Sequence, residues 1–154
     1  MAEPATFKDL KSILTFAVRR EEEAAQAYSE MKELAEDKSL RAVLEELEAE
    51  ERKHKILLEE VLEGKSRPET PVYVADLRIS DYVEDEPLGP SPTIQELLIF
   101  AAKKEQKAAD LYTALASKSH ERQHQKLFGF LASQEKTHKL RLEMEYERYF
   151  LAEN

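Results

Sequence analysis

Four long segments of the sequence carry apolar residues at alternating spacings of four and three, the spacing that places them on one face of an α-helix. A helix with one apolar face is stable when that face packs against other helices, so these stripes predict an all-α fold, a four-helix bundle. The length of 154 residues suits a single domain that spans residues 1–154. The expected helices cover residues 6–36, 39–63, 92–118 and 121–150.

The connections between these segments predict how the helices are arranged. Short turns near Asp37–Ser39 and Ser117–His120 make each neighbouring pair an antiparallel hairpin. Between the pairs, residues 64–91 hold most of the prolines, which end the helical pattern, and we expect a long crossover along one side of the bundle. Its apolar residues, among them Val72 and Tyr82, favour packing against the helices.

Composition excludes several classes of protein. The formal net charge of −9, without a basic stripe, disfavours nucleic acid or an anionic membrane as a partner. Because the chain has no cysteine, its residues cannot form disulfides, thiolate zinc sites or iron–sulfur clusters. No apolar run approaches the roughly 18 residues of a membrane span, and the first residues lack a signal-peptide core, so we expect a cytoplasmic location.

The two halves of the sequence repeat each other at an offset of 84 residues. The offset needs no gap through either pair of segments, and it relates Tyr28 to Tyr112 and Leu47 to Leu131. Two similar hairpins in one bundle predict a pseudo-twofold axis between them.

Glutamate and histidine residues interrupt the apolar stripes and are therefore expected to point inward. A buried carboxylate without a partner costs several kcal/mol, so four in one layer need compensating charge. Two divalent cations would balance four carboxylates and two neutral imidazoles. Residues three apart share a helix face, so each Glu-x-x-His pair can bind one ion, while carboxylates of neighbouring helices bridge both ions. The six candidate metal ligands are Glu21, Glu51, His54, Glu105, Glu135 and His138.

Other acidic and histidine residues do not lie on the apolar stripes at the height of the six candidate ligands. His120 falls in a predicted turn, and His124 lies about three helical turns from Glu135, so neither is an expected ligand. The acidic residues expected on solvated faces instead are Glu22, Glu23, Glu45, Glu46 and Glu48.

Two pairs of polar residues next to the candidate ligands have open roles. Tyr28 and Tyr112 lie on the inward stripe, where each ring can simply fill the core or each hydroxyl can donate to a ligand carboxylate of a neighbouring helix. Glu50 and its counterpart Gln134 lie beside the stripe, either as outer partners of the ligands or as surface residues.

The motifs E-x-x-A-x-x-A-Y (residues 21–28) and E-x-x-A-x-x-L-Y (105–112), each followed by L-x-x-x-E-x-x-H (47–54 and 131–138), resemble the rubrerythrin branch of the ferritin-like proteins. The resemblance covers nearly the whole chain. It implies a ferritin-like four-helix bundle, frequently dimeric, with a non-haem di-iron centre that reacts with peroxide or dioxygen. It also implies that the six candidate residues are the iron ligands.

Two departures from the rubrerythrin pattern bear on the expected chemistry. Typical members carry a rubredoxin domain with an iron held by four cysteines, whereas this cysteine-free chain resembles the short forms without it. Its electrons are therefore expected from a separate donor protein. Typical members also carry an extra glutamate one turn after the ligand of the third helix, and here Ala108 occupies that position. The residue associated with peroxidase-type ligand switching is thus missing.

These observations lead to one main hypothesis and two alternatives. The main hypothesis is a di-iron oxidoreductase that reacts with peroxide or dioxygen and is re-reduced by an external donor, most simply as a homodimer. Its cofactor would be two iron ions, although manganese or zinc also suits imidazole and oxygen ligands. The first alternative is a ferroxidase or iron-storage protein, although only LAEN follows Phe150, which leaves no fifth helix of the kind found in cage-forming ferritins. The second is an interaction protein with a structural metal pair.

Overall fold

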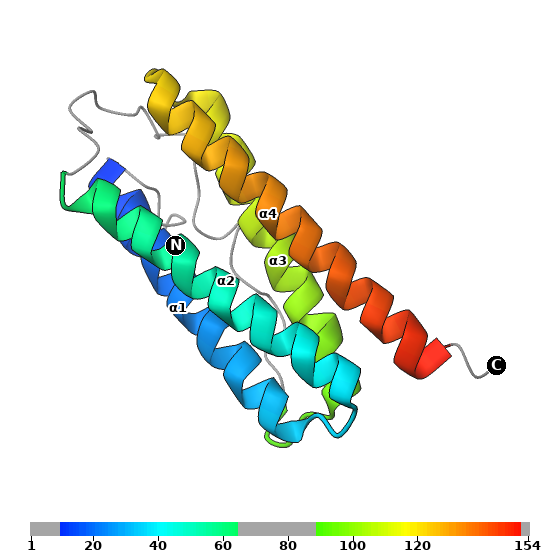
Figure 1. Ribbon diagram of the computed structural model, residues 1–154. Helices are drawn as coiled ribbons and strands as arrows, with labels where there is room; N and C mark the ends of the chain where they lie inside the picture. Colours follow the sequence, from blue (N-terminus) through cyan, green and yellow to red (C-terminus); the bar gives the residue numbers. More distant parts are fainter. Residues whose placement is uncertain (1–9, 65–88, 152–154) are drawn as a thin grey trace, which may run out of the picture.

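The computed structural model describes residues 10–64 and 89–151 and shows a bundle of four α-helices, which confirms the predicted ferritin-like fold class (Figure 1). A short π-helical turn, η2, continues the last helix. Among the described residues, no helix is long and apolar enough to cross a membrane. The elements are α1 (Leu10–Leu34), α2 (Lys38–Leu62), α3 (Ile94–Lys118), α4 (Arg122–Tyr146) and η2 (Glu147–Leu151).

Local capping chemistry determines where several helices begin and end. The Asp37 side chain accepts a hydrogen bond of 2.9 Å from the Leu40 backbone N–H and so caps α2. Thr93 and Glu96 form a reciprocal capping box at the start of α3. After α2, Gly64 adopts a φ of +81°, a left-handed conformation that glycine accepts without strain.

Most expected helix boundaries differ from those observed by one or two residues, and the largest difference is at the end of the last helix. The last helix was expected to reach residue 150, but regular α-helix ends at Tyr146 and residues 147–151 form the wider π-helical turn. There the ring of Phe150 packs 5.3 Å from that of Tyr146. The first helix ends at Leu34, two residues early, because the following turn provides the cap of α2. Residues 6–9 and most of the expected crossover, including Val72 and Tyr82, lie outside the described part of the chain.

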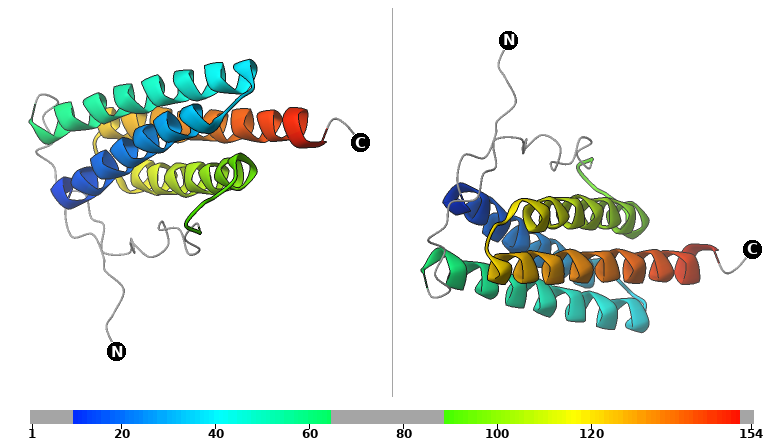
Figure 2. Two further views of the ribbon diagram at one scale, coloured as in Figure 1. Left: turned by 90° about the horizontal axis from the view of Figure 1, so that it is seen from below. Right: turned by 90° about the horizontal axis from the view of Figure 1, so that it is seen from above.

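The helices pair as the short turns predicted, with α1 packed on α2 and α3 packed on α4. Figure 2 shows the two hairpins side by side along the whole bundle. Helix α2 ends at the opposite end of the bundle from the start of α3 (Figure 1), as the crossover topology requires. Helices α1 and α3 therefore run antiparallel to each other, which is the arrangement expected of two hairpins related by a twofold axis perpendicular to the helices.

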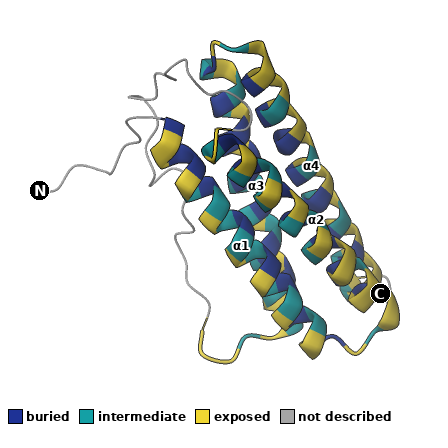
Figure 3. Ribbon diagram, turned by 60° about the vertical axis from the view of Figure 1, so that its left-hand side comes forward, coloured by how far each residue is buried: buried dark blue, intermediate teal, exposed yellow. Residues whose placement is uncertain are grey.

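Two apolar clusters fill the bundle, one toward each end. One contains Ile13, Leu14 and Phe128, and the other contains Met31 and Leu44. Buried residues follow the inner faces of the helices, while the outer faces are exposed (Figure 3). Burial of these apolar side chains, worth about 1.5–3 kcal/mol for each large one, stabilises the bundle on both sides of the layer between the clusters.

Candidate metal centre

The layer between the two apolar clusters is built from glutamate and histidine side chains on all four helices. Every one of the predicted ligand residues is buried, with at most 3% of its surface exposed. The register of each helix explains this, since each residue continues an apolar stripe that faces the bundle interior. The layer contains Glu21 on α1, Glu51 and His54 on α2, Glu105 on α3, and Glu135 and His138 on α4.

The six side chains form two overlapping groups of possible ligand atoms, and within each group the atoms lie within 4.8 Å of one another. Two carboxylates, those of Glu51 and Glu135, belong to both groups. Shared carboxylates in this arrangement can bridge two ions. The sequence offset of 84 residues exchanges the two groups, as the predicted pseudo-twofold axis requires. The first group is Glu21, Glu51, His54 and Glu135, and the second is Glu51, Glu105, Glu135 and His138.

Both histidine rings present the nitrogen Nδ1 to the carboxylates. In His54, Nδ1 lies 2.9 Å from Oε1 of Glu135, and in His138, Nδ1 lies 2.7 Å from Oε1 of Glu51. The two rings stack with their centroids 5.5 Å apart and their planes inclined by 10°. Each imidazole thus points at a carboxylate of the opposite hairpin, so the two hairpins complete each other's set of donor atoms.

The two core tyrosines make a reciprocal pair of hydrogen bonds across the bundle. The hydroxyl of Tyr28 on α1 donates to Glu105 on α3, and that of Tyr112 on α3 donates to Glu21 on α1 at 2.5 Å. Burial, followed by the charge of the carboxylate, raises the pKa of each tyrosine well above its ordinary value. Both hydroxyls therefore remain protonated donors that hold one oxygen of each glutamate and leave the other oxygen free to bind an ion.

Outside the buried layer, the outer nitrogen of His138 contacts a carboxylate, whereas no such contact is seen for His54 among the described residues. Oε2 of Glu50 lies 2.7 Å from Nε2 of His138, and Arg141 approaches the same carboxylate to 3.7 Å. The repeat places the neutral amide of Gln134 at the corresponding position of the other half. The structure thus gives Glu50 the outer-partner position that the sequence left open, and it adds Arg141, which the helical pattern did not single out.

Burial and neighbouring charges shift the pKa values within the layer. Burial, and then the charge of Glu105, raise the pKa of Glu51 and of Glu135 well above the ordinary value. Burial opposes ionisation of Glu105, but hydrogen bonds with Glu135 and a histidine lower its pKa. Burial likewise disfavours the charged form of His54, yet Glu135 and Glu21 raise its pKa to about 10. In the metal-free protein, protons thus partly neutralise the charge that cations would otherwise balance.

The unpaired atoms of the layer fit metal ions. Five buried ligand atoms have no hydrogen-bond partner among the described residues, although an unpaired polar atom of this kind is costly. Two atoms bound to one ion at about 2.0–2.2 Å stand roughly 3 Å apart, which is the kind of separation found between the histidine nitrogens and the carboxylates. These atoms are Oε2 of Glu21, Glu51 and Glu105, Oε1 of Glu135 and Nδ1 of His54, of which the last two lie 2.9 Å apart without forming a hydrogen bond.

The residues that the sequence set aside lie away from this layer. Glu22 forms an ion pair of 2.7 Å with Lys55, and Glu48 forms one of 2.9 Å with Arg52. His124 is buried, but in a different place, where its Nδ1 lies 3.6 Å from Glu121. None of these side chains belongs to either group of possible ligands among the described residues.

Comparisons with known proteins agree with this site. The Rubrerythrin family model matches residues 12–146. A solved structure of a hypothetical protein from Pyrococcus furiosus is similar, with a TM-score of 0.70 and 26% sequence identity over 90% of this chain and 88% of that chain. A search of curated proteins finds no match. Because the family model spans both hairpins and all six buried donor residues, the chain belongs to the rubrerythrin family.

Proposed function

We propose that the protein is a non-haem di-iron oxidoreductase that reacts with peroxide or dioxygen and is re-reduced by a separate electron donor. The observation that carries this proposal is the pair of overlapping donor groups that share Glu51 and Glu135. Each group provides three carboxylates and one imidazole, and two shared carboxylates would hold two ions close together. This is the donor arrangement of di-iron carboxylate bundles.

The donor atoms favour iron or manganese. Imidazole nitrogen together with carboxylate oxygen suits either metal, and zinc can also occupy such a site. Two bound iron ions would supply the electrons that reduce the oxidant. We propose Glu21, Glu51, His54, Glu105, Glu135 and His138 as the ligands.

The other residues of the site would position these ligands. Tyr28 donates to Glu105 and Tyr112 donates to Glu21, so each tyrosine holds one carboxylate of the opposite hairpin. A movement of either glutamate would therefore also move a tyrosine of the other hairpin. The apolar clusters pack against the layer on both sides along the bundle. Because the chain has no cysteine, it has no iron–sulfur or rubredoxin-type centre of its own, and its electrons would come from a partner protein.

The test is anaerobic loading with ferrous iron followed by rapid mixing with peroxide and, separately, with dioxygen. We expect two iron ions per chain and new ferric absorption with at least one oxidant. Bound iron without absorption changes with either oxidant would contradict the oxidoreductase and favour a structural metal pair. Sizing of the native protein separates the storage alternative, since a large cage supports storage and a small oligomer such as the proposed homodimer opposes it.

A further inference from the structure

A cavity of about 300 Å³ between α1 and α3 reaches the candidate metal centre. Its lining includes the carboxylates of Glu21, Glu51 and Glu135 and the methyl group of Ala108. Among the described residues that line this cavity, neither His54 nor His138 is found. A small molecule that enters between α1 and α3 would therefore meet the carboxylate side of the centre.

The rim of this cavity carries two cation–aromatic pairs that the 84-residue offset relates to each other. Cζ of Arg20 lies 5.8 Å from the ring centre of Phe16, and Nζ of Lys104 lies 5.1 Å from that of Phe100. Arg20 also donates a hydrogen bond of 3.0 Å to the backbone carbonyl of Lys104 and so joins α1 to α3. We call these four residues the α1–α3 mouth, and their mutual contacts hold both cations at the rim.

The charge at the rim differs from that of the layer behind it. Arg20 and Lys104 provide two positive charges, and the exposed Glu23, which also lines the cavity, provides one negative charge. Two bound divalent ions would neutralise the four carboxylates of the layer. When two divalent ions occupy the centre, the net charge at the mouth is positive. This positive charge would attract small anions and repel metal cations.

We propose that the α1–α3 mouth is the entry route for the exogenous ligand of the centre and that Arg20 and Lys104 select small inorganic anions over metal cations. This inference rests on the proposed function and narrows its oxidant. Hydrogen peroxide arrives uncharged at neutral pH, but it can bind beside the two cations as its anion, hydroperoxide, once its proton has passed to solvent. Dioxygen forms no such anion by loss of a proton. The small side chain of Ala108 keeps the route open where a longer one would fill it.

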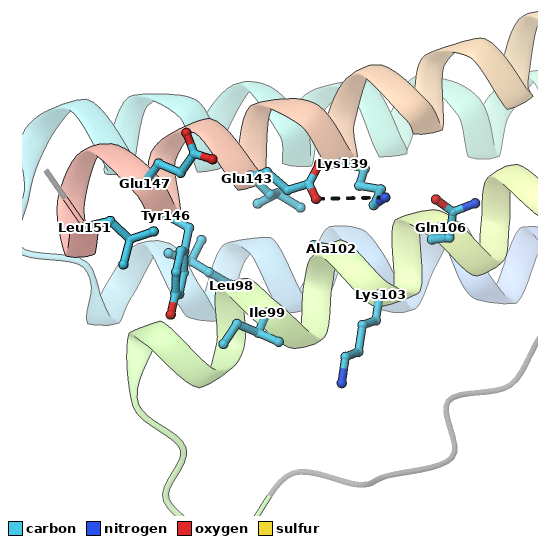
Figure 4. Close-up of a pocket in the computed structure, with 11 residues that line it drawn as sticks. Leu98, Ile99, Ala102, Lys103, Gln106, Lys139, Glu143, Tyr146, Glu147 and Leu151 are labelled. Atoms are coloured by element: carbon cyan, nitrogen blue, oxygen red, sulfur yellow. Dashed lines mark ion pairs between the residues drawn. The ribbon is translucent and has the colours of Figure 1, made fainter.

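Azide binding to the cobalt(II)-loaded protein tests the charge selection, because azide is a small stable anion and cobalt reports its binding by visible absorption. The variants are Arg20→Gln, Lys104→Gln and their combination. The matched control is Lys103→Gln, which removes the same charge one residue away, at the rim of a separate groove between α3 and α4 (Figure 4). We expect about threefold slower binding for each single variant and about tenfold for the double variant, the lower end of electrostatic steering.

For the control variant, azide binding should stay within about twofold of the wild-type rate, because Lys103 does not line the cavity. An equal loss in this control, or no loss in the double variant, would overturn the selection by Arg20 and Lys104. The rate of cobalt uptake provides a second readout. The double variant should take up cobalt at least as fast as the wild type, and slower uptake would contradict repulsion of cations at the mouth.

Ala108→Leu tests the route without a change of charge. The larger side chain should slow azide binding while the cobalt stoichiometry stays at the wild-type value, and unchanged azide kinetics would place the route elsewhere. Failure of the proposed function is seen separately, as an iron-loaded protein that reacts with neither peroxide nor dioxygen. Azide binding needs only bound cobalt, so the two proposals can fail independently.

Discussion

Replacing Glu50 by Gln should weaken the metal position that contains His138 and leave the position that contains His54 nearly unchanged. Glu50 approaches the outer nitrogen of His138 to 2.7 Å, whereas the related residue of the other half is Gln134. A carboxylate behind a ligand imidazole raises its basicity, and loss of such an outer partner typically costs about 10–100-fold in metal affinity.

The structure places the expected loss at the lower end of that range. The Glu50 side chain is 36% exposed, and Arg141 lies 3.7 Å from it, so solvent and a competing cation already weaken its effect on His138. The glutamine oxygen can still accept a hydrogen bond from the ring. We therefore expect about a tenfold loss of affinity, or about 1.4 kcal/mol, at this one position.

Stepwise titration of the metal-free protein with cobalt measures this effect. The wild type should bind two ions with unequal affinities, and Glu50→Gln should reduce the difference between the two affinities. Gln134→Glu should do the same by strengthening the other position. Glu46→Gln is the control, because Glu46 is 65% exposed and pairs with the same Arg141 without touching either histidine. If Glu46→Gln and Glu50→Gln have equal effects, or Glu50→Gln has none, the reasoning is wrong.

Three further predictions concern the layer and the core. Glu51→Gln removes a carboxylate shared by both donor groups, so metal analysis should show fewer than two ions per chain, and an unchanged stoichiometry would count against the site. In His124→Leu, leucine replaces a buried imidazole that makes no side-chain hydrogen bond among the described residues, and leucine is also the residue at the related position 40. This change should stabilise the fold by about 1 kcal/mol and raise Tm by about 2–4 °C in thermal unfolding. The stability of the metal-free protein should depend on pH through Glu51. The pKa of this carboxyl is raised on folding, so the folded state binds more protons than the unfolded state. The contribution of Glu51 to the free energy of unfolding therefore falls as the pH rises above 4.5. His54 acts in the same direction between pH 6.5 and about 10, whereas metal binding needs deprotonated ligands, so the gain in Tm on adding cobalt should be larger at pH 8 than at pH 6.

Helical register was sufficient to predict which side chains form the buried layer. Glu51 continues the apolar stripe of α2 and is buried, while Glu48, three residues earlier and off the stripe, is partly exposed and pairs with Arg52. The direction of a side chain on a helix follows from its position in the sequence, so such distinctions need no knowledge of the neighbouring helices. The fold class followed from the same stripes together with the lengths of the connections.

Contacts between hairpins were harder to predict, because they depend on how the helices cross. Glu50 lies next to the stripe of α2, and only the approach of α4 brings His138 to its carboxylate. Arg20 and Lys104 look like ordinary surface cations in the sequence. The signal that could have identified them is the repeat, which pairs Phe16 and Arg20 with Phe100 and Lys104.

The way the two hairpins share the centre also bears on the origin of the chain. Each donor group takes residues from both halves, and each core tyrosine holds a glutamate of the other half. One half alone therefore lacks a complete site, whereas two copies of a single ancestral hairpin would supply all six donors as a symmetric dimer. Duplication and fusion of its gene would turn that dimer into one chain whose halves could diverge. On that account, the difference between Glu50 and Gln134 would be one such divergence, because it makes the surroundings of the two donor groups chemically distinct.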